Sequence, residues 1–340
     1  MEPETKKRKG MEHDPDSWEV LPVLSDEKSQ DVKLVDAYAA PITQKKETSR
    51  LVRDLSAVYP LPDLQHIKRV RACKEKSGPH PLEVILCLVT DVPEIKNKPP
   101  TLTDLLRSEE FNCTGLGEPF LVQIPASPPL TRPQFERASK HWPTSFHEDK
   151  RITSALKGQL FTSNQKTEMQ TYMTRAVQAA RCAQELGADA VGAVIVDPRS
   201  GQIVAVGHDL RRAGNPLHHA VMACIDLVAR SQGGGAYQYK NYPGCTYAAL
   251  DSVSVCSSDG GGNDRPYICT GYDLYVTREP CVMCAMALVH SRISRVFYAV
   301  ASADGALGTK YKIHCQKDLN HHFQVYKGVM LQACEKLMSE

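Results

Sequence analysis

The stretch REPCVMCAMALVHSRI, residues 278–293, places two cysteines one helical turn apart at the start of a predicted helix. Pro280 suits this position, because its missing N–H costs nothing in the first turn of a helix. Cys281 and Cys284 are three residues apart, so both sulfurs lie on one face of one turn. The dipole and free amides of a helix N-terminus also favour thiolates. The spacing therefore predicts part of a metal site.

A second predicted helix start supplies a histidine. In NPLHHAVMACIDLVAR, residues 215–230, His219 opens a helix in the same way. Zinc sites use Cys thiolates and His nitrogens, and catalytic sites combine three protein ligands with a water. Taken alone, a Cys-x-x-Cys is also typical of a redox pair or two buried thiols, and a single His of a core residue. Together, His219, Cys281 and Cys284 predict a Zn²⁺ site, with His218 as the rival ligand.

Apolar runs typical of strands surround both helix starts, and a long amphipathic helix precedes them. The order is β-β-α-insertion-β-α-β, which predicts an α/β domain with a mixed sheet and helices packed on it. A Gly/Ser-rich segment interrupts the pattern and is expected to be a flexible insertion. The predicted elements are a helix at 165–186, strands at 190–198, 202–209, 272–280 and 295–300, and the insertion at 233–266, within a domain spanning 165–340.

The N-terminal half has a different pattern. Strand-like and helix-like runs follow one another in the order β-α-β-β-α-β, which is the split-βαβ arrangement of a ferredoxin-like α+β domain. These runs are 32–42, 48–59, 66–74, 82–89, 101–111 and 119–127. We therefore expect an N-terminal α+β domain over residues 26–130, a disordered charged tail over 1–25, and a Pro-rich charged linker over 131–164 that contains a short helix.

Composition is that of an ordinary soluble protein. The 340 residues suffice for two domains, with 42 % hydrophobic and 24 % charged residues and a formal net charge of +2. No apolar run is long enough for a membrane span, and the charged N-terminus is no secretory signal. The twelve cysteines then predict reduced thiols or metal ligands in the cytoplasm and nucleus. Lys6 to Lys9 form either a nuclear import signal or a solvated basic tail.

Residues 165–315 resemble the cytidine and tRNA adenosine deaminase superfamily, whose mark is a His-x-Glu paired with a Pro-Cys-x-x-Cys. The resemblance is carried by HAV at 219–221, PCVMCAMALVHSRISRVFY at 280–298 and ADGALG at 303–308. The second and third segments match the tRNA adenosine deaminase branch. The family's spacing selects His219 over His218, and the resemblance implies a cytidine-deaminase-like mixed sheet sandwiched by helices.

Two residues depart from the family pattern. Val221 stands where the family has the glutamate that shuttles protons, a function typically worth about 10² to 10⁴ in rate. Asp209 stands where active members of this branch have an Asn that holds the base. No residue of this site is therefore predicted to be catalytic. The alternative is a self-sufficient zinc deaminase that uses another carboxylate, such as Asp226 or Glu279.

The resemblance implies a non-catalytic subunit of a heterodimeric tRNA adenosine deaminase, acting beside a catalytic partner that keeps its glutamate. The partner complex would convert the wobble adenosine of tRNA to inosine, and the N-terminal domain would help to capture the tRNA. A third reading is an interaction protein whose metal only holds the fold together. The fourth zinc position could be closed by a protein group, for which the C-terminal Glu340 is a candidate.

Basic residues cluster at two places that suit phosphate contacts. The alternative for the first cluster is an edge strand that charge protects from aggregation. The predicted RNA contacts are Lys68, Arg69, Arg71, Lys74 and Lys76 in the N-terminal domain, and Arg211 and Arg212 near the metal site.

Overall fold

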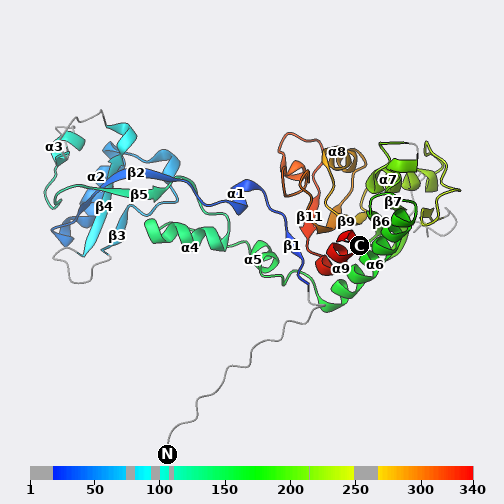
Figure 1. The fold of residues 1–340 in the computed structure, drawn as a ribbon. Coiled ribbons are helices and arrows are strands. Elements are labelled where there is room, and N and C mark those ends of the chain that lie inside the picture. Colours follow the sequence, from blue (N-terminus) through cyan, green and yellow to red (C-terminus); the bar gives the residue numbers. More distant parts are fainter. Residues whose placement is uncertain are drawn as a thin grey trace, which may run out of the picture. The chain divides into compact units, whose positions relative to one another are not determined.

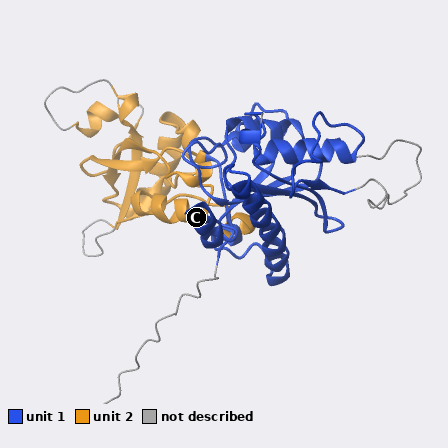
Figure 2. Cartoon of the chain, turned by 45° about the vertical axis from the view of Figure 1, so that its right-hand side comes forward, with its two compact units in different colours: residues 1–25, 154–340 blue, residues 26–153 orange. Residues whose placement is uncertain are grey.

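The computed structural model describes residues 18–73, 81–92, 100–106, 111–213, 215–248 and 267–339. The chain forms two compact units, one made of residues 26–153 and the other of residues 1–25 together with 154–340 (Figure 2). The basic cluster Lys6 to Lys9, the predicted RNA contacts Lys74 and Lys76, and Glu340 lie outside the described residues. Within the described ranges, no helix is both long and apolar enough to cross a membrane.

The C-terminal unit is built on one mixed sheet, as the sequence predicted. Its strand order is β1-β11-β10-β9-β6-β7-β8, in which β9, β10 and β11 are parallel and the other neighbours are antiparallel. The bounds are β1 Leu21–Pro22, β6 Gly192–Asp197, β7 Gln202–His208, β8 Thr246–Tyr247, β9 Asp273–Arg278, β10 Arg295–Val300 and β11 Gln324–Lys327.

Helices cover both faces of this sheet (Figure 1). α6 (Ser163–Glu185) and α9 (Leu331–Ser339) pack on one face, and α7 (Ala220–Ser231) and α8 (Val282–His290) on the other. A capping box between Thr162 and Gln165 begins α6. Gly192 lets this helix lie close to β6, since a Cβ there would come within 1.9 Å of the Ala176 carbonyl oxygen. The central strands are therefore buried on both sides, which is why they are almost continuously apolar.

The N-terminal unit contains a four-stranded antiparallel sheet of order β3-β4-β2-β5. This order confirms the predicted split-βαβ arrangement. Leu51 and Leu55 of α2 and Leu105 of α3 pack together on one face of the sheet. The elements are β2 Leu34–Pro41, α2 Thr48–Val58, β3 Val70–Ala72, β4 Leu82–Leu88, α3 Leu102–Leu105 and β5 Phe120–Pro125, preceded by α1 Asp26–Ser29.

The other face of this sheet is covered by the segment that was predicted to begin the linker. α4 (Arg132–His141) leads to Trp142, whose side chain is fully buried and whose Nε1 donates to the Lys68 carbonyl oxygen at 2.6 Å. Compact unit 26–153 therefore extends well beyond residue 130. The segment is polar in composition because its outer face is exposed to solvent. α5 (Lys150–Leu156) comes next.

Residues 18–25 belong to the C-terminal unit and are ordered, in contrast to the predicted disordered tail. β1 pairs with β11, with Leu21 opposite Lys327, and Val20 is 1 % exposed. The His314 Nε2 bonds the Val23 carbonyl oxygen at 3.0 Å. A short apolar segment without a local partner gives little sequence signal, because its strand forms only against the distant β11.

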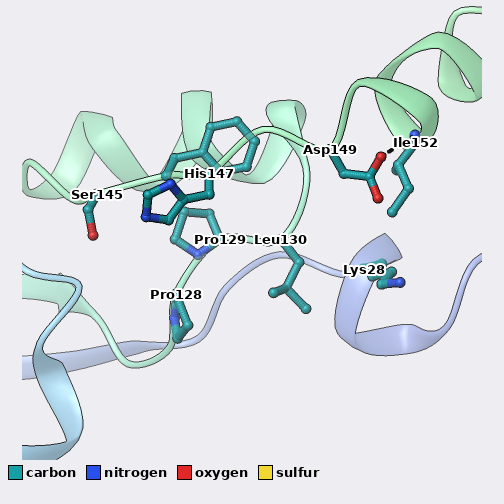
Figure 3. A pocket seen from close by; sticks show the side chains of 9 residues that line it. Lys28, Pro128, Pro129, Leu130, Ser145, His147, Asp149 and Ile152 are labelled. Atoms are coloured by element: carbon teal, nitrogen blue, oxygen red, sulfur yellow. Dashed lines mark hydrogen bonds between the residues drawn. The ribbon is translucent and has the colours of Figure 1, made fainter.

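A hollow of about 330 Å³ lies in the N-terminal unit between α1, the turn after β5 and the start of α5 (Figure 3). Its lining is mainly apolar and holds one histidine, His147, and one aspartate, Asp149, which caps α5 through the Arg151 and Ile152 amides. This lining contains no cysteine, so the hollow does not offer the thiol ligands of the cysteine cluster.

Candidate metal centre

The start of α8 positions both cysteines. Cys281 is the N-cap residue, with extended backbone (φ −73°, ψ 176°), and Cys284 lies one turn further and is 2 % exposed. The helix begins directly after Pro280, so the two thiols face the same side of its first turn.

The start of α7 brings in the histidine. His219 is the N-cap residue of that helix, and its Nδ1 lies 3.6 Å from the Cys281 sulfur. The ligand atoms of His219, Cys281 and Cys284 all lie within 4.8 Å of one another. Two helix starts that are far apart in the sequence thus present one imidazole and two sulfurs to the same point, as the motif spacing predicted.

The electrostatics of the cluster suit a metal ion. A hydrogen bond from the Cys284 thiol, helped by backbone amides of the first helical turn, lowers the pKa of Cys281 to about 5 in spite of partial burial. The same hydrogen bond, with burial, raises the pKa of Cys284. One thiolate is therefore already favoured without an ion. Two sulfurs and one imidazole form the donor set that Zn²⁺ prefers, so the residues present fit that metal.

His218 does not belong to the cluster. Its ring meets Tyr237 edge-on with a centroid distance of 4.1 Å, and its Nε2 lies 3.2 Å from Asn215 Nδ2. Burial lowers the pKa of His218, which favours a neutral, packed imidazole. The choice of His219 over its neighbour agrees with this geometry.

Val221 is part of the hydrophobic core. It is 3 % exposed and packs in the cluster between α7, α8 and the sheet. It lies in the first turn of α7, two residues after His219. The position that would carry a proton acceptor beside the metal ligands is therefore filled by an apolar side chain without a titratable atom.

Asp209 is held by an arginine rather than facing an open pocket. Its side chain is 3 % exposed, and its carboxylate accepts from Arg211 Nε at 2.7 Å and from the Arg211 amide at 3.1 Å. Arg211 Nη2 also donates to Asp189 at 2.6 Å. Two carboxylates therefore hold the guanidinium of Arg211, and its contact with RNA stays a prediction. Its neighbour Arg212 is exposed.

Glu279 serves as the anchor of a loop. Its carboxylate accepts hydrogen bonds from the Leu307 amide at 2.9 Å and the Thr309 amide at 3.0 Å, and also from the Ser302 amide and the Thr309 hydroxyl. Gly305 is required over this carboxylate, since a Cβ would meet it at 2.1 Å. Both oxygens of this carboxylate are therefore engaged in holding the loop at residues 302–309.

Asp226 has a similar structural function at the other helix. It accepts hydrogen bonds from the Ala236 amide at 2.6 Å and the Tyr237 amide at 3.3 Å, and so holds the first part of the predicted insertion against α7. Residues 233–248 are thus ordered, and 249–266 lie outside the described residues. Neither acid named in the alternative mechanism is free to replace the missing glutamate.

Comparison with known proteins agrees with this site. Residues 35–142 match the model of the N-terminal domain of the tRNA-specific adenosine deaminase TAD3, and residues 166–300 match the cytidine and deoxycytidylate deaminase zinc-binding region. A Danio rerio protein named "Probable inactive tRNA-specific adenosine deaminase-like protein 3" is 67 % identical over the full length of both chains. The chain belongs to this family of inactive tRNA-specific adenosine deaminase-like proteins.

Two other relatives have related names. A Homo sapiens protein of that name is 53 % identical, over 96 % of this chain and 93 % of its own. A Schizosaccharomyces pombe protein named "tRNA-specific adenosine deaminase subunit tad3" is 28 % identical, over 86 % of this chain and 80 % of its own. As a member of the inactive family, the chain is not catalytic on its own, which agrees with Val221 in the core.

In this inactive-deaminase chain, the arginines of the basic segment in the N-terminal unit make contacts within the fold that the sequence did not predict. Arg69 donates to the Ile85 and Leu86 carbonyl oxygens at 2.9 and 2.8 Å, and burial lowers its pKa to about 10. Arg71 lies over the Trp142 ring at 4.0 Å. It also pairs with Glu83 at 2.6 Å and donates to the His141 carbonyl oxygen.

These contacts give both arginines a structural role, and their contact with RNA stays a prediction. Lys68 is the predicted basic contact that is exposed in the described part of this strand. One of these contacts could have been predicted from the sequence. If the two strands form an antiparallel hairpin, Glu83 lies opposite Arg71. The family match that ends at residue 142 also includes α4 and Trp142 in the N-terminal domain.

Proposed function

We propose that this chain is the zinc-binding, non-catalytic subunit of a tRNA adenosine deaminase complex, in which it positions tRNA while a partner subunit converts the wobble adenosine to inosine. The names of the relatives support this assignment: the vertebrate proteins are called inactive, and the Schizosaccharomyces pombe protein is called a subunit of a deaminase. The N-terminal domain that precedes the zinc-binding region would supply a further surface for the tRNA.

One observation carries the proposal: three metal ligands are assembled while the proton-shuttle position is an apolar core residue. His219, Cys281 and Cys284 would hold Zn²⁺, and the ion would join the starts of α7 and α8. Because such a site does not exist in the unfolded chain, zinc binding contributes free energy to folding. Retention of the ligands without the glutamate is expected if the ion stabilises the subunit rather than performing chemistry.

The residues that surround the site support the same conclusion. Asp209 is neutralised by Arg211, and Glu279 and Asp226 are occupied by backbone amides of two loops. A self-sufficient deaminase would need a carboxylate that can take a proton from a metal-bound water and pass it on. Proton transfer would therefore take place in the partner subunit.

The test is an inosine assay on tRNA with purified components. The chain alone should bind about one zinc and form no inosine, whereas addition of the catalytic partner should give inosine at the wobble position. Partner without this chain should be inactive or strongly impaired. Inosine formed by this chain alone would contradict the proposal.

Two substitutions give a matched control. At saturating tRNA, Asp226→Asn and Glu279→Gln should leave the complex able to form inosine wherever the variants fold, because neither carboxylate takes part in the chemistry. Loss of turnover in a folded variant that keeps its zinc and its partner would favour the self-sufficient enzyme instead.

A further inference from the structure

Two short segments beside the metal centre form one exposed surface. Residues 211–213 and 215–218 contact residues 236–242 at two points: the His218 ring meets Tyr237 at a centroid distance of 4.1 Å, and the Tyr242 hydroxyl donates to the Ala213 carbonyl oxygen at 3.3 Å. Together they bring four exposed side chains to one part of the C-terminal unit. We call this surface the tyrosine rim, consisting of Arg212, Leu217, Tyr237 and Lys240.

The tyrosine rim combines apolar area with positive charge. Leu217 is 56 % and Tyr237 is 41 % exposed. Arg212 and Lys240 are also exposed, and neither forms an ion pair with any residue in the described ranges. The neighbouring acid, Asp226, is occupied by the amides that begin the second segment. The two unpaired cations of the rim can therefore contact the phosphates of an anionic partner.

The rim is also preorganised. Asp226 fixes the backbone at Ala236 and Tyr237, and His218 supports the Tyr237 ring from the edge. Asn215 in turn lies within hydrogen-bond distance of His218 at 3.2 Å. An aromatic ring held in this way and 41 % exposed loses little conformational entropy when a flat group packs on its exposed part.

We propose that the tyrosine rim binds unpaired nucleotides of a tRNA, with a nucleobase stacked on Tyr237 and Leu217 and phosphates contacting Arg212 and Lys240. Aromatic rings beside basic side chains are the usual means of holding single-stranded nucleic acid, since every base has a face that can stack. This inference rests on the proposed function. Exposed tyrosine and leucine also occur in protein interfaces, but the cores of such interfaces are depleted in lysine.

The test uses the complex of this chain with its catalytic partner. Tyr237→Ala should weaken tRNA binding about tenfold, because removal of one stacking ring typically costs that much or more, whereas Tyr237→Phe should bind as the wild type does. The matched control is Tyr247→Ala, since Tyr247 is similarly exposed, at 47 %, on β8. Binding is measured as Kd by filter retention of an unmodified tRNA transcript.

The salt dependence of tRNA binding separates the contribution of the two cations of the rim from that of its aromatic ring. The double substitution Arg212→Ala with Lys240→Ala should lower the slope of log Kd against log salt by about 1.4 to 1.8, as expected for two lost phosphate contacts. Tyr237→Ala should leave this slope unchanged. Thermal melts establish that each variant is folded, and if Tyr237→Ala is not, Tyr237→Leu keeps the apolar bulk while removing the aromatic face and should still bind weakly.

Two results would overturn the inference. One is tRNA affinity within twofold of the wild type for folded Tyr237→Ala and Tyr237→Leu complexes. The other is dissociation of the subunits on gel filtration of these variants, which would make the rim a protein interface. A wild-type complex whose tRNA affinity and inosine formation do not depend on this chain would instead refute the proposed function itself, so the two failures are distinguishable.

Discussion

The metal centre and the basic segment at residues 68–71 were both predicted from short sequence motifs, but the fold holds their side chains in different ways. His219, Cys281 and Cys284 converge within 4.8 Å. Arg69 and Arg71, predicted to face RNA, are instead bonded to main-chain carbonyls, to Glu83 and over Trp142. The two regions differ in what determines the direction of a side chain.

At a helix start, direction is largely a local matter. The N-cap position and the first turn fix where Cys281, Cys284 and His219 point, whatever else the chain does. In a strand, by contrast, a side chain's partner lies on neighbouring strands and on whatever covers the sheet. The guanidinium of Arg71 meets a tryptophan that is seventy-one residues away in sequence.

Removal of a metal ligand should give the largest effect in this comparison. Cys284→Ser is expected to abolish zinc binding and lower Tm by more than about 10 °C, because the ion joins two helix starts and its binding free energy contributes to folding. Zinc per chain is measured by elemental analysis, and Tm by calorimetry. Cys73→Ser, a thiol outside the cluster, is the control; equal effects of both would contradict a metal centre.

Arg69→Met should have the next largest effect. It leaves the Ile85 and Leu86 carbonyl oxygens without their donors, so we expect a loss of about 2–4 kcal/mol in the free energy of unfolding. Urea denaturation of the full chain measures it. A variant as stable as the wild type but weaker in tRNA binding would restore the original prediction that this arginine contacts RNA.

Acid should destabilise both units through one buried histidine in each. Burial lowers the pKa of His314, bonded to the Val23 carbonyl oxygen, and of His66, bonded to the Pro125 carbonyl oxygen. As pH falls, the unfolded chain therefore binds a proton at each of these histidines before the folded chain does. The free energy of unfolding has its full value above about pH 6.5 and decreases as pH falls through the lower pKa of the folded state.

The slope should be at most about 1.4 kcal/mol per pH unit for each histidine. Unfolding free energies at pH 7.5 and 5.0 check this, and His314→Asn should lessen the difference between them. His322→Asn, at an exposed position, should not. An unchanged pH dependence in His314→Asn would show that this histidine does not carry the effect.

Lys68→Ala should give the smallest effect on stability, within about 0.5 kcal/mol, since its side chain is exposed. If Lys68 contacts a phosphate, the salt slope of tRNA binding by the complex should fall by about 1. Salt titration of binding measures this. An unchanged slope would leave β3 a purely structural strand, and would sharpen the contrast with the metal centre.

Much of the fold could be predicted, because alternation and helical spacing record which face of each element is buried. Both sheets and their central strands follow that pattern, whereas the edge strand β8 and the strands β1 and β11 were not predicted. The segments whose place in the fold was not predicted have one feature in common. Residues 18–25 and α4 acquire their partners from remote parts of the chain, β11 and the N-terminal sheet, and nothing nearby in sequence indicates those partners.

The candidate site divides in the same way. His219, Cys281, Cys284 and the absence of a titratable group at Val221 could be predicted from the sequence. The state of the surrounding acids could not, because the number of amides that reach Glu279 depends on how residues 302–309 fold over it. Nor could the pairing of Asp209 with Arg211 and of Arg211 with Asp189 be predicted.

The sequence by itself determined the three candidate metal ligands, the loss of the proton shuttle and the alternation that builds two sheets, since all three depend on residue type and local spacing. The tertiary structure alone decided which charged groups are free. Burial and hydrogen bonding turned Arg69, Arg71, Arg211 and Glu279 into structural residues, and left Arg212 and Lys240 exposed beside Tyr237. The physical reason is that a charge is neutralised by the neighbours that the fold supplies, and these neighbours are mostly distant in sequence.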